Sequence, residues 1–309
     1  MPKRRICLLF GGCSDEREIS ISSADAVYEA LDKDKYEILR YDARDDLQKF
    51  INDIFAKKFD LVFPILHGSF GEDGKLQGML DILNMPYVFS KTSASALAMD
   101  KHKSKLIASN VNLQVAPDII LKQGDNYSIK EIVDILSLPI VIKPNEMGSS
   151  IGMTIVQEKG KLVEGIKKGF NYDSTIILEK FIEGRELTVA VFGNNPPIAL
   201  PVIEIIPRIS KWFDYKAKYE VGGSNEICPA KIPEDVRKRT QELSIKIFKA
   251  IGCKDLSRVD FIWDTKNNKL YFLEINTIPG MTKVSLVPKA ANAAGMEFGE
   301  FLDKLIKYA

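Results

Sequence analysis

Hydrophobic and polar residues alternate most regularly near the end of the chain. Two runs, 258–264 and 270–276, are each typical of a β-strand that is buried on one face. The segment between them, 265–269, is polar and rich in turn formers, so we expect a β-hairpin. One face of this hairpin collects apolar side chains that a core would bury: Val259, Phe261, Trp263, Tyr271, Leu273 and Ile275.

The opposite face of the hairpin collects polar side chains. With Asp264 paired to Leu270, the alternation of side chains places two cross-strand pairs there: Arg258 with Asn276, and Asp260 with Glu274. Two carboxylates and an amide oxygen suit Mg²⁺, whose remaining ligands often come from substrate phosphates. The alternative is a solvated face with an Arg–Asp ion pair. The rigid loop 277–282 follows directly, and sites are often built on such loops, which favours the metal.

From the N-terminus onward, short apolar runs alternate with helical patterns. We expect strands at 6–10, 60–66 and 86–89, and helices at 22–31 and 76–83. This alternation predicts a doubly wound parallel sheet, whose ligands bind beyond the carboxyl ends of its strands. Residues 11–12, 67–68 and the acidic turn 71–74 lie at such ends. This first α/β domain is expected to span residues 1–92.

Beyond residue 92 the pattern changes to a mixture of α and β elements. We expect a lysine-rich helix at 94–109, strands at 139–143, 153–156, 175–181 and 186–192, and helices at 162–170, 233–251 and 298–308. We therefore predict two further domains, 93–183 and 184–309, so the fold class combines α/β with α+β.

Composition restricts the class of protein. The 309 residues, 45% hydrophobic and 28% charged, suit two or three globular domains. A net charge of +1 provides no basic field for nucleic acid, and no apolar run is long enough to cross a membrane. The apolar run 6–10 is too short for the core of a signal peptide. Four cysteines without paired spacing indicate a reducing compartment and no zinc site, so we expect a cytoplasmic protein.

A glycine-serine loop at 148–152 is the second motif. Its small residues let backbone N–H groups approach an anion, and its serines add hydroxyl donors. Lys143 ends the strand that enters the loop and suits a phosphate partner. The alternative is an ordinary hairpin turn. The loop is not of the Walker A type, because it lacks Gly-Lys-Ser/Thr and no helix follows directly.

Two more segments have the character of a nucleotide site. Residues 177–186 contain the charged end of one strand and pass through Gly184 into the next strand. Such a crossover would line an adenine slot, and a carboxylate would reach the ribose. Residues 211–219 mix aromatic side chains with lysines, which suits a lid that excludes water from a reactive intermediate. The alternatives are a surface connector and an amphipathic surface segment, respectively.

Taken in order, these motifs resemble the ATP-grasp superfamily and, more narrowly, the D-alanine–D-alanine ligase family. The resemblance runs nearly end to end, through Gly11–Ser20, His67-Gly68, Gly71–Gly78, Met99–Lys101, Lys143-Pro144, Gly148–Ser150, Phe213–Tyr219, Cys228–Ala230 and Glu274–Thr282. It implies an N-terminal doubly wound domain followed by a two-part ATP-grasp fold. The departures, Phe89–Lys91 and Trp212-Phe213, affect only local loop geometry.

The resemblance implies that ATP activates one D-alanine as an acyl phosphate and that the amine of a second attacks it. The product, D-alanyl-D-alanine, serves peptidoglycan synthesis and therefore the cell wall and cell shape. ATP is the implied co-substrate and two Mg²⁺ ions the implied cofactor, with Mn²⁺ as a substitute. The implied assembly is a homodimer without nucleic-acid or membrane partners.

The resemblance also implies a role for each matching residue. The expected catalytic residues are Glu16, Ser150, Tyr219, Arg258 and Gly280. The expected substrate-binding residues are His67, Ser285 and Leu286. The expected ATP-binding residues are Lys101, Lys143, Ser149, Ser150, Glu179, Lys180, Ile182, Glu186 and Lys218. The expected metal ligands are Asp260, Glu274 and Asn276.

Three alternatives stay open. The second substrate is D-lactate or D-serine in related enzymes, although Tyr219 resembles the dipeptide-forming type. A nucleotide-binding regulator without turnover would carry a lesion in the expected machinery, and none is found at Lys143, Arg258, Asp260, Glu274 or Asn276. A ligase for another carboxylate is disfavoured by Glu16, Ser150, Tyr219 and Ser285.

Overall fold

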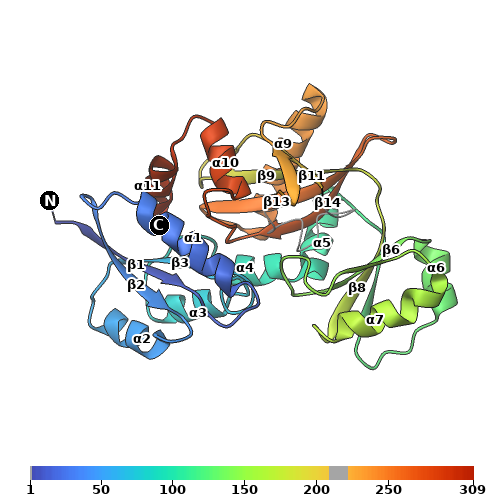
Figure 1. Cartoon of the computed structure of the whole chain (residues 1–309), viewed down its shortest axis with the longest axis horizontal. Helices are drawn as coiled ribbons and strands as arrows, with labels where there is room; N and C mark the ends of the chain where they lie inside the picture. The colour runs from blue at the N-terminus through green and yellow to red at the C-terminus, as the bar shows by residue number, and fades with distance from the viewer. Residues whose placement is uncertain (1, 209–221) are drawn as a thin grey trace.

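Three β-sheets organise the chain in the computed structural model, which describes residues 2–208 and 222–309 (Figure 1). An N-terminal sheet lies at the left of the view, a large sheet at the upper centre and a small sheet at the right. The helices α4 (Thr92–Met99) and α5 (Lys101–Asn110) run between them. The expected combination of α/β and α+β architecture is confirmed.

The N-terminal sheet is parallel, with strand order β2-β1-β3. Its elements are β1 (Arg4–Phe10), α1 (Arg17–Ala30), β2 (Tyr36–Asp42), α2 (Leu47–Phe55), β3 (Leu61–Ile65) and α3 (Lys75–Ile82). Along β1, Ile6 and Leu8 pack with α1, whereas Cys7 and Leu9 pack with α2 and α3. Helices therefore cover both faces, as the doubly wound prediction requires.

Two N-terminal predictions need correction, and two elements were not predicted. The strand expected at 86–89 is reduced to a single bridge between Tyr87 and Val62, because Pro86 has no N–H and Phe89 adopts a φ of 79°. The helix expected from residue 22 begins at Arg17. The apolar pattern does not indicate this start, because the first turns of the helix bury serines instead of apolar side chains. The pattern also failed to predict β2 and α2.

The small sheet is antiparallel, with strand order β5-β8-β6-β7. Its elements are β5 (Asp118–Lys122), α6 (Ile129–Leu136), β6 (Ile140–Pro144), β7 (Thr154–Val156), α7 (Leu162–Phe170) and β8 (Thr175–Lys180). The helices α6 and α7 contribute to its core. The glycine-serine loop connects β6 to β7 and is thus also a hairpin connection.

The large sheet has the strand order β12-β11-β9-β13-β14-β4, with β10 paired to β9. Its elements are β4 (Gln114–Val115), β9 (Arg185–Phe192), β10 (Ile198–Ala199), β11 (Ile203–Pro207), β12 (Ser224–Ile227), α9 (Glu234–Ile251), β13 (Leu256–Asp264), β14 (Lys269–Asn276), α10 (Leu286–Ala293) and α11 (Phe298–Tyr308). α4, α5 and α9 pack in one core, while α10 and α11 share the other core with α1.

The lysine-rich helix expected at 94–109 is two helices. Asp100 has an extended backbone, and its side chain accepts a hydrogen bond from the Lys103 N–H, so it ends α4 and caps α5. Among the described residues, no helix combines the length and the apolar character needed to cross a bilayer.

The predicted hairpin is confirmed, and its register is correct at the functional end. Arg258 pairs with Asn276 and Asp260 with Glu274. The register near the turn is wrong, since Asp264 pairs with Lys269 and not with Leu270. A bulge after Asp260 adds one residue to β14, and a one-residue shift turns side chains to the other face. The core therefore takes Leu270 and Phe272 instead of Tyr271 and Leu273.

Candidate active site

A cavity of about 320 Å³ brings together residues from all parts of the described chain. Its lining includes these predicted site residues: Glu16, His67, Lys101, Ser149, Arg258, Glu274, Asn276, Gly280, Ser285 and Leu286. They come from the N-terminal loops, the start of α5, the glycine-serine loop, the β13–β14 pair and the segment before α10. The lining does not include the predicted residues Lys143, Ser150, Glu179, Lys180, Ile182, Glu186 and Asp260 among those described.

The polar face of the β13–β14 pair forms one wall of the cavity. Arg258 donates from Nε to Asp260 Oδ1 at 3.0 Å and from Nη2 to Oδ2 at 2.8 Å. Thr188 on the neighbouring β9 donates to Asp260 Oδ1 at 2.5 Å. The Arg–Asp pair of the alternative interpretation is thus present. The face is nevertheless not a solvated one, because Asp260 is buried and Arg258 lines the cavity beside Glu274.

The donor set on this wall fits Mg²⁺. In the described residues no group of three or more His, Cys, Asp or Glu side chains is arranged as a metal site. Mg²⁺ does not need such a group, because one or two carboxylates together with phosphate oxygens suffice. Asp260 and Glu274 are cross-strand partners, and Asn276 adds an amide oxygen that also accepts the Ile278 N–H at 3.0 Å.

Glu16 also lines the cavity and lies immediately before α1. Its carboxylate is buried and accepts a hydrogen bond from the Ser149 hydroxyl, 133 residues away in sequence. A Cβ atom at position 148 would lie 2.5 Å from Glu16 Oε2, so only Gly148 allows this close approach. The contact comes from Ser149, the neighbour of Ser150, for which the resemblance implies a grouping with Glu16.

The start of α5 fixes the glycine-serine loop. Lys101 donates from Nζ to the Met147 carbonyl oxygen at 2.6 Å, and its Nζ lies 3.6 Å from Glu274 Oε2. Asn145, which is buried, accepts the Lys101 N–H on its carbonyl at 3.2 Å and the His102 N–H on Oδ1 at 2.9 Å. Lys101, which is expected to bind the phosphates of ATP, therefore connects the glycine-serine loop to the β13–β14 wall that carries the expected metal ligands.

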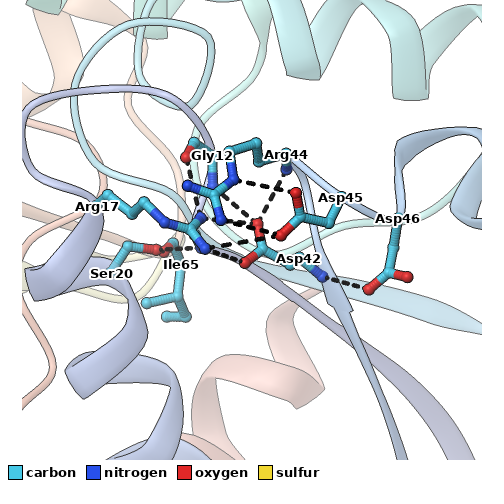
Figure 2. Close-up of polar contacts among 9 residues, drawn as sticks. Gly12, Arg17, Ser20, Asp42, Arg44, Asp45, Asp46 and Ile65 are labelled. Atoms are coloured by element: carbon cyan, nitrogen blue, oxygen red, sulfur yellow. Dashed lines mark hydrogen bonds and ion pairs between the residues drawn. The ribbon is translucent and has the colours of Figure 1, made fainter.

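An ion pair between Arg17 and Asp42, drawn in Figure 2, ties the first residue of α1 to the end of β2. Arg17 donates to Asp42 Oδ2 at 2.6 Å, to Oδ1 at 2.9 Å and to the Gly12 carbonyl at 3.0 Å. Through its hydrogen bonds Arg17 lowers the pKa of Asp42 to about 2. The sequence analysis missed this pair. Its only signal was the position of Asp42 at the end of a strand that was itself not predicted.

His67 and Glu72 fix the loop that leads to Gly280. Burial holds the pKa of His67 below its ordinary value, and the neutral ring donates from Nδ1 to the Ile278 carbonyl at 3.0 Å. Glu72 accepts the Gly68 N–H at 2.7 Å. Burial raises the pKa of Glu72 to about 8, and the negative charge of Glu16 acts in the same direction. Both side chains line the cavity, and both have backbone partners.

The segment before α10 forms the remaining wall. Ser285 Oγ accepts the Thr282 N–H at 3.0 Å and lies 2.7 Å from the Thr282 hydroxyl. Leu286 begins α10, so its N–H belongs to the first turn, where helices provide no internal partner. A helix start of this kind suits the carboxylate of a small substrate.

The other residues expected around the nucleotide lie on β6, β8, β9 and the connection between β8 and β9. Lys143 Nζ is 2.7 Å from Glu179 Oε2, and both side chains are buried. Glu186 pairs with Ile262 on the same face as Asp260, because it is two residues from Thr188. The Lys180 side chain is exposed and Ile182 is half-buried. Lys218, Tyr219 and the expected lid at 211–219 lie outside the described residues.

Comparisons with known proteins identify the family of this chain. The family described as D-ala D-ala ligase C-terminus matches residues 107–307, and its N-terminal counterpart matches residues 5–53 and 40–90. A D-alanine–D-alanine ligase of Syntrophobacter fumaroxidans is 44% identical, over 99% of this chain and 98% of its own length. Another, from Desulfotalea psychrophila, is 45% identical over 98% and 94%, respectively.

Solved structures agree as well. VanG, a D-Ala:D-Ser ligase from Enterococcus faecalis, superposes with a TM-score of 0.86 at 34% identity and covers 99% of both chains. A D-alanine–D-alanine ligase from Bacillus anthracis, complexed with ATP, gives a TM-score of 0.84 at 31% identity over 99% of this chain and 96% of its own. The chain therefore belongs to the D-alanine–D-alanine ligase family and has its ATP-grasp fold.

Proposed function

We propose that this protein joins two D-alanine molecules in an ATP-dependent reaction that releases ADP and phosphate. The observation that carries the proposal is the single cavity in which Glu16, the glycine-serine loop and the β13–β14 wall meet. Such a cavity can hold the ammonium group of D-alanine at Glu16 and the phosphates of ATP near Lys101. The carboxylate of that D-alanine would then lie close to the γ-phosphate.

The first step transfers the γ-phosphoryl group of ATP to the carboxylate of one D-alanine, giving an acyl phosphate and ADP. Glu16 binds the ammonium group of this D-alanine, and His67 and Glu72 fix the surrounding loops. Lys101, Lys143 and the backbone of the glycine-serine loop neutralise and align the phosphates, which is what phosphoryl transfer requires of a protein. Glu179, Lys180 and Ile182 meet the adenine, and Glu186 meets the ribose.

In the second step the amine of another D-alanine attacks the acyl carbon, loses a proton, and expels phosphate from a tetrahedral intermediate. Arg258 and the Gly280 N–H stabilise the developing oxyanion, a type of contact worth roughly 3–4 kcal/mol each. Ser285 and the Leu286 N–H hold the carboxylate of the second D-alanine. Ser150, Tyr219 and Lys218 complete the closed site.

Asp260, Glu274 and Asn276 are the residues that would hold Mg²⁺, two ions in all, with Mn²⁺ as a substitute. When bound, the metal supplies charge neutralisation between the phosphate oxygens. Support for this assignment comes from the donor chemistry and the cross-strand register of the three side chains. Isothermal titration of Mg²⁺ into the ADP complex tests it, since Asn276→Ala should weaken the metal-dependent part of the heat.

Phosphate release with a panel of D- and L-amino acids and D-lactate tests the reaction. We expect phosphate release when D-alanine is the only amino acid supplied. As the second substrate, we expect D-alanine to be preferred over D-lactate near neutral pH. Faster turnover with D-lactate would overturn the choice of second substrate. D-serine is the second candidate, because one similar structure is that of a D-Ala:D-Ser ligase.

The cellular setting follows from the same proposal. D-alanyl-D-alanine made in the cytoplasm would enter peptidoglycan precursors and so support the cell wall and cell shape. The homodimer and the domain divisions after residues 92 and 183 stay predictions. Light scattering of the purified protein tests the first, and limited proteolysis tests the second.

A further inference from the structure

A buried lysine outside the proposed mechanism lies behind the nucleotide end of the site. Lys105 follows Lys101 by one turn of α5, and its side chain is only 3% exposed. Its ammonium nitrogen is 2.6 Å from Glu179 Oε1, 2.5 Å from Asp118 Oδ2 and 3.1 Å from the Ala116 carbonyl oxygen. These three acceptors match the three donors of a lysine.

The sheet register explains why a cation is needed at this point. Asp118 on β5 and Glu179 on β8 are direct cross-strand partners. Like charges directly opposite each other destabilise a sheet, and Glu179 is almost fully buried. Lys105 bonds to both carboxylates and so compensates both charges.

Glu179 has another cation on its second oxygen. Lys143 lies 2.7 Å from Oε2 while Lys105 holds Oε1. Burial alone would raise the pKa of Glu179, but the charges of Lys143 and Lys105 outweigh it and hold the pKa below its usual value. Burial would likewise lower the pKa of Lys143, but Glu179 outweighs that effect and the pKa is raised. Two charged lysines therefore share one charged carboxylate.

The two lysines differ in how firmly they are held. Lys105 has three oxygen partners and belongs to a helix that joins the small sheet to the large one. Lys143 lies near the end of β6, directly before the glycine-serine loop, where the phosphates of ATP are proposed to bind. Lys143 can thus exchange Glu179 for a phosphate, whereas Lys105 is fixed.

We propose that Lys105 is a positioning residue for nucleotide binding, which stays on Glu179 while Lys143 turns to the ATP phosphates. The inference rests on the proposed ATP roles of Lys143 and Glu179. With Lys105 present, Glu179 stays compensated and oriented toward the adenine after Lys143 has left. Without Lys105, Glu179 retains Lys143 as its counter-ion, and the phosphates lose that cation.

Calorimetric titration of the full chain with ADP and Mg²⁺ tests this inference through Lys105→Met. We expect ADP to bind about 10-fold to 100-fold more weakly, the value of one charge-assisted hydrogen bond. Adenosine, which has no phosphate, should lose much less affinity. The KM for ATP should rise, and the KM for D-alanine should stay the same. Lys130→Met is the matched control, because Lys130 is an exposed lysine paired with Asp134.

A second background separates positioning from a merely structural role. In Glu179→Gln only the charge of Asp118 remains for Lys105 to compensate, so adding Lys105→Met should change ADP affinity little if Lys105 acts through Glu179. An equal loss in both backgrounds would show that Lys105 acts through the packing of α5 or through Asp118, and would overturn the inference. Should Lys105→Met fail to fold, Lys105→Gln keeps a donor for Glu179 without the charge and carries the same expectation.

Lys143→Met separates the proposed phosphate role of Lys143 from the positioning role of Lys105. If it leaves ADP binding unchanged, the proposed phosphate role of Lys143 fails, whatever Lys105 does. If Lys143→Met weakens ADP binding and Lys105→Met does not, the phosphate role stands and the inference about Lys105 fails. Thermal unfolding of each variant shows whether its fold is retained.

Discussion

Glu16 and Glu179 are both buried carboxylates, the first proposed for the substrate end of the site and the second for the nucleotide end, and the structure holds them in different ways. Glu16 is contacted by the Ser149 hydroxyl and approached by the backbone at Gly148. Glu179 is held between two ammonium groups, with Lys105 at 2.6 Å and Lys143 at 2.7 Å. Loops position the first carboxylate, while sheet register and buried charge position the second.

This difference indicates which end adapts when substrates enter. Ser149, which bonds to Glu16, lies on a loop, and both Ser149 and Ser150 have positive φ angles, of 50° and 59°. Glu179 lies on paired strands and is held by Lys105 on a helix, so this carboxylate is set before ATP arrives, and only Lys143 is proposed to turn to the phosphates. Changes at the Glu16 end should therefore alter the KM for D-alanine, and changes at the Glu179 end the KM for ATP.

The largest effect is expected from Glu274→Gln, which removes a charge from the wall between the two ends. Losing a metal-binding charge should lower kcat by roughly 100-fold or more, because the phosphates are no longer neutralised. Phosphate release measures this, with Glu164→Gln, an exposed position, as control. The fold should be retained, because Glu274 is only partly buried. Near-normal turnover would refute the metal assignment.

Glu16→Gln should break the substrate end alone. The variant keeps an acceptor for the Ser149 hydroxyl but loses the charge that meets the ammonium group. Leaving one partner of a buried charge pair unmatched costs about 2–5 kcal/mol, so the KM for the first D-alanine should rise by at least about 30-fold. The KM for ATP should change little. A similar rise in both constants would mean that the two ends are not separate.

The sequence predicted the strand-built parts of the site better than the loop-built parts. The pairs Arg258–Asn276 and Asp260–Glu274 follow from side-chain alternation, which has a period of two residues. The bulge that shifts Leu270 into the core has no signal in that period. The two pairs at the site end were nevertheless right. The assumed partner of Asp264, Leu270, is one residue beyond the true partner, Lys269, and the bulge adds that one residue to β14.

Contacts between distant loops could not be predicted in the same way. The bond from Ser149 to Glu16 depends on φ angles in the sterically disfavoured left-handed region, and the pattern of polar residues does not encode them. Nothing in the pattern of the lysine-rich helix singles out Lys105, because its acceptors, Asp118 and Glu179, are 13 and 74 residues away. Buried charges of this kind become visible only with the fold.

Asp42→Asn should loosen the substrate end indirectly. It leaves the Arg17 guanidinium and the Gly12 N–H without the charged partner, at a cost of about 1–3 kcal/mol in the free energy of unfolding. The KM for D-alanine should rise by several-fold, less than in Glu16→Gln, while the KM for ATP stays constant. Asp45→Asn, at a mostly exposed side chain, is the matched control.

The pH dependence of this variant gives a second measurement. The pKa of Asp42 is lowered to about 2 in the folded protein, against about 3.9 in an unfolded chain. Its contribution to stability is therefore present above pH 4 and is lost as the pH falls toward 2. Urea unfolding should show a constant difference between the native protein and the variant from pH 5 to 8, and a shrinking one below pH 4. A difference that persists at the lowest pH would mean that the charge of Asp42 is not its source.

The smallest effect is expected from Ser149→Ala, which removes the hydroxyl that holds Glu16. One hydrogen bond to a charged group is worth about 1.5–3 kcal/mol at most, and a mobile water can replace part of it, so the KM for D-alanine should rise about 3-fold to 10-fold. The backbone N–H groups expected to meet the phosphates are kept, so the KM for ATP should change less. Serine and alanine both carry a Cβ atom, so Ser149→Ala adds no strain at a φ of 50°, whereas Ser149→Gly also relieves about 1–2 kcal/mol of it. An equal rise in the KM for D-alanine in both variants assigns the effect to the lost hydroxyl, and a larger rise in the glycine variant assigns the excess to the backbone of the loop.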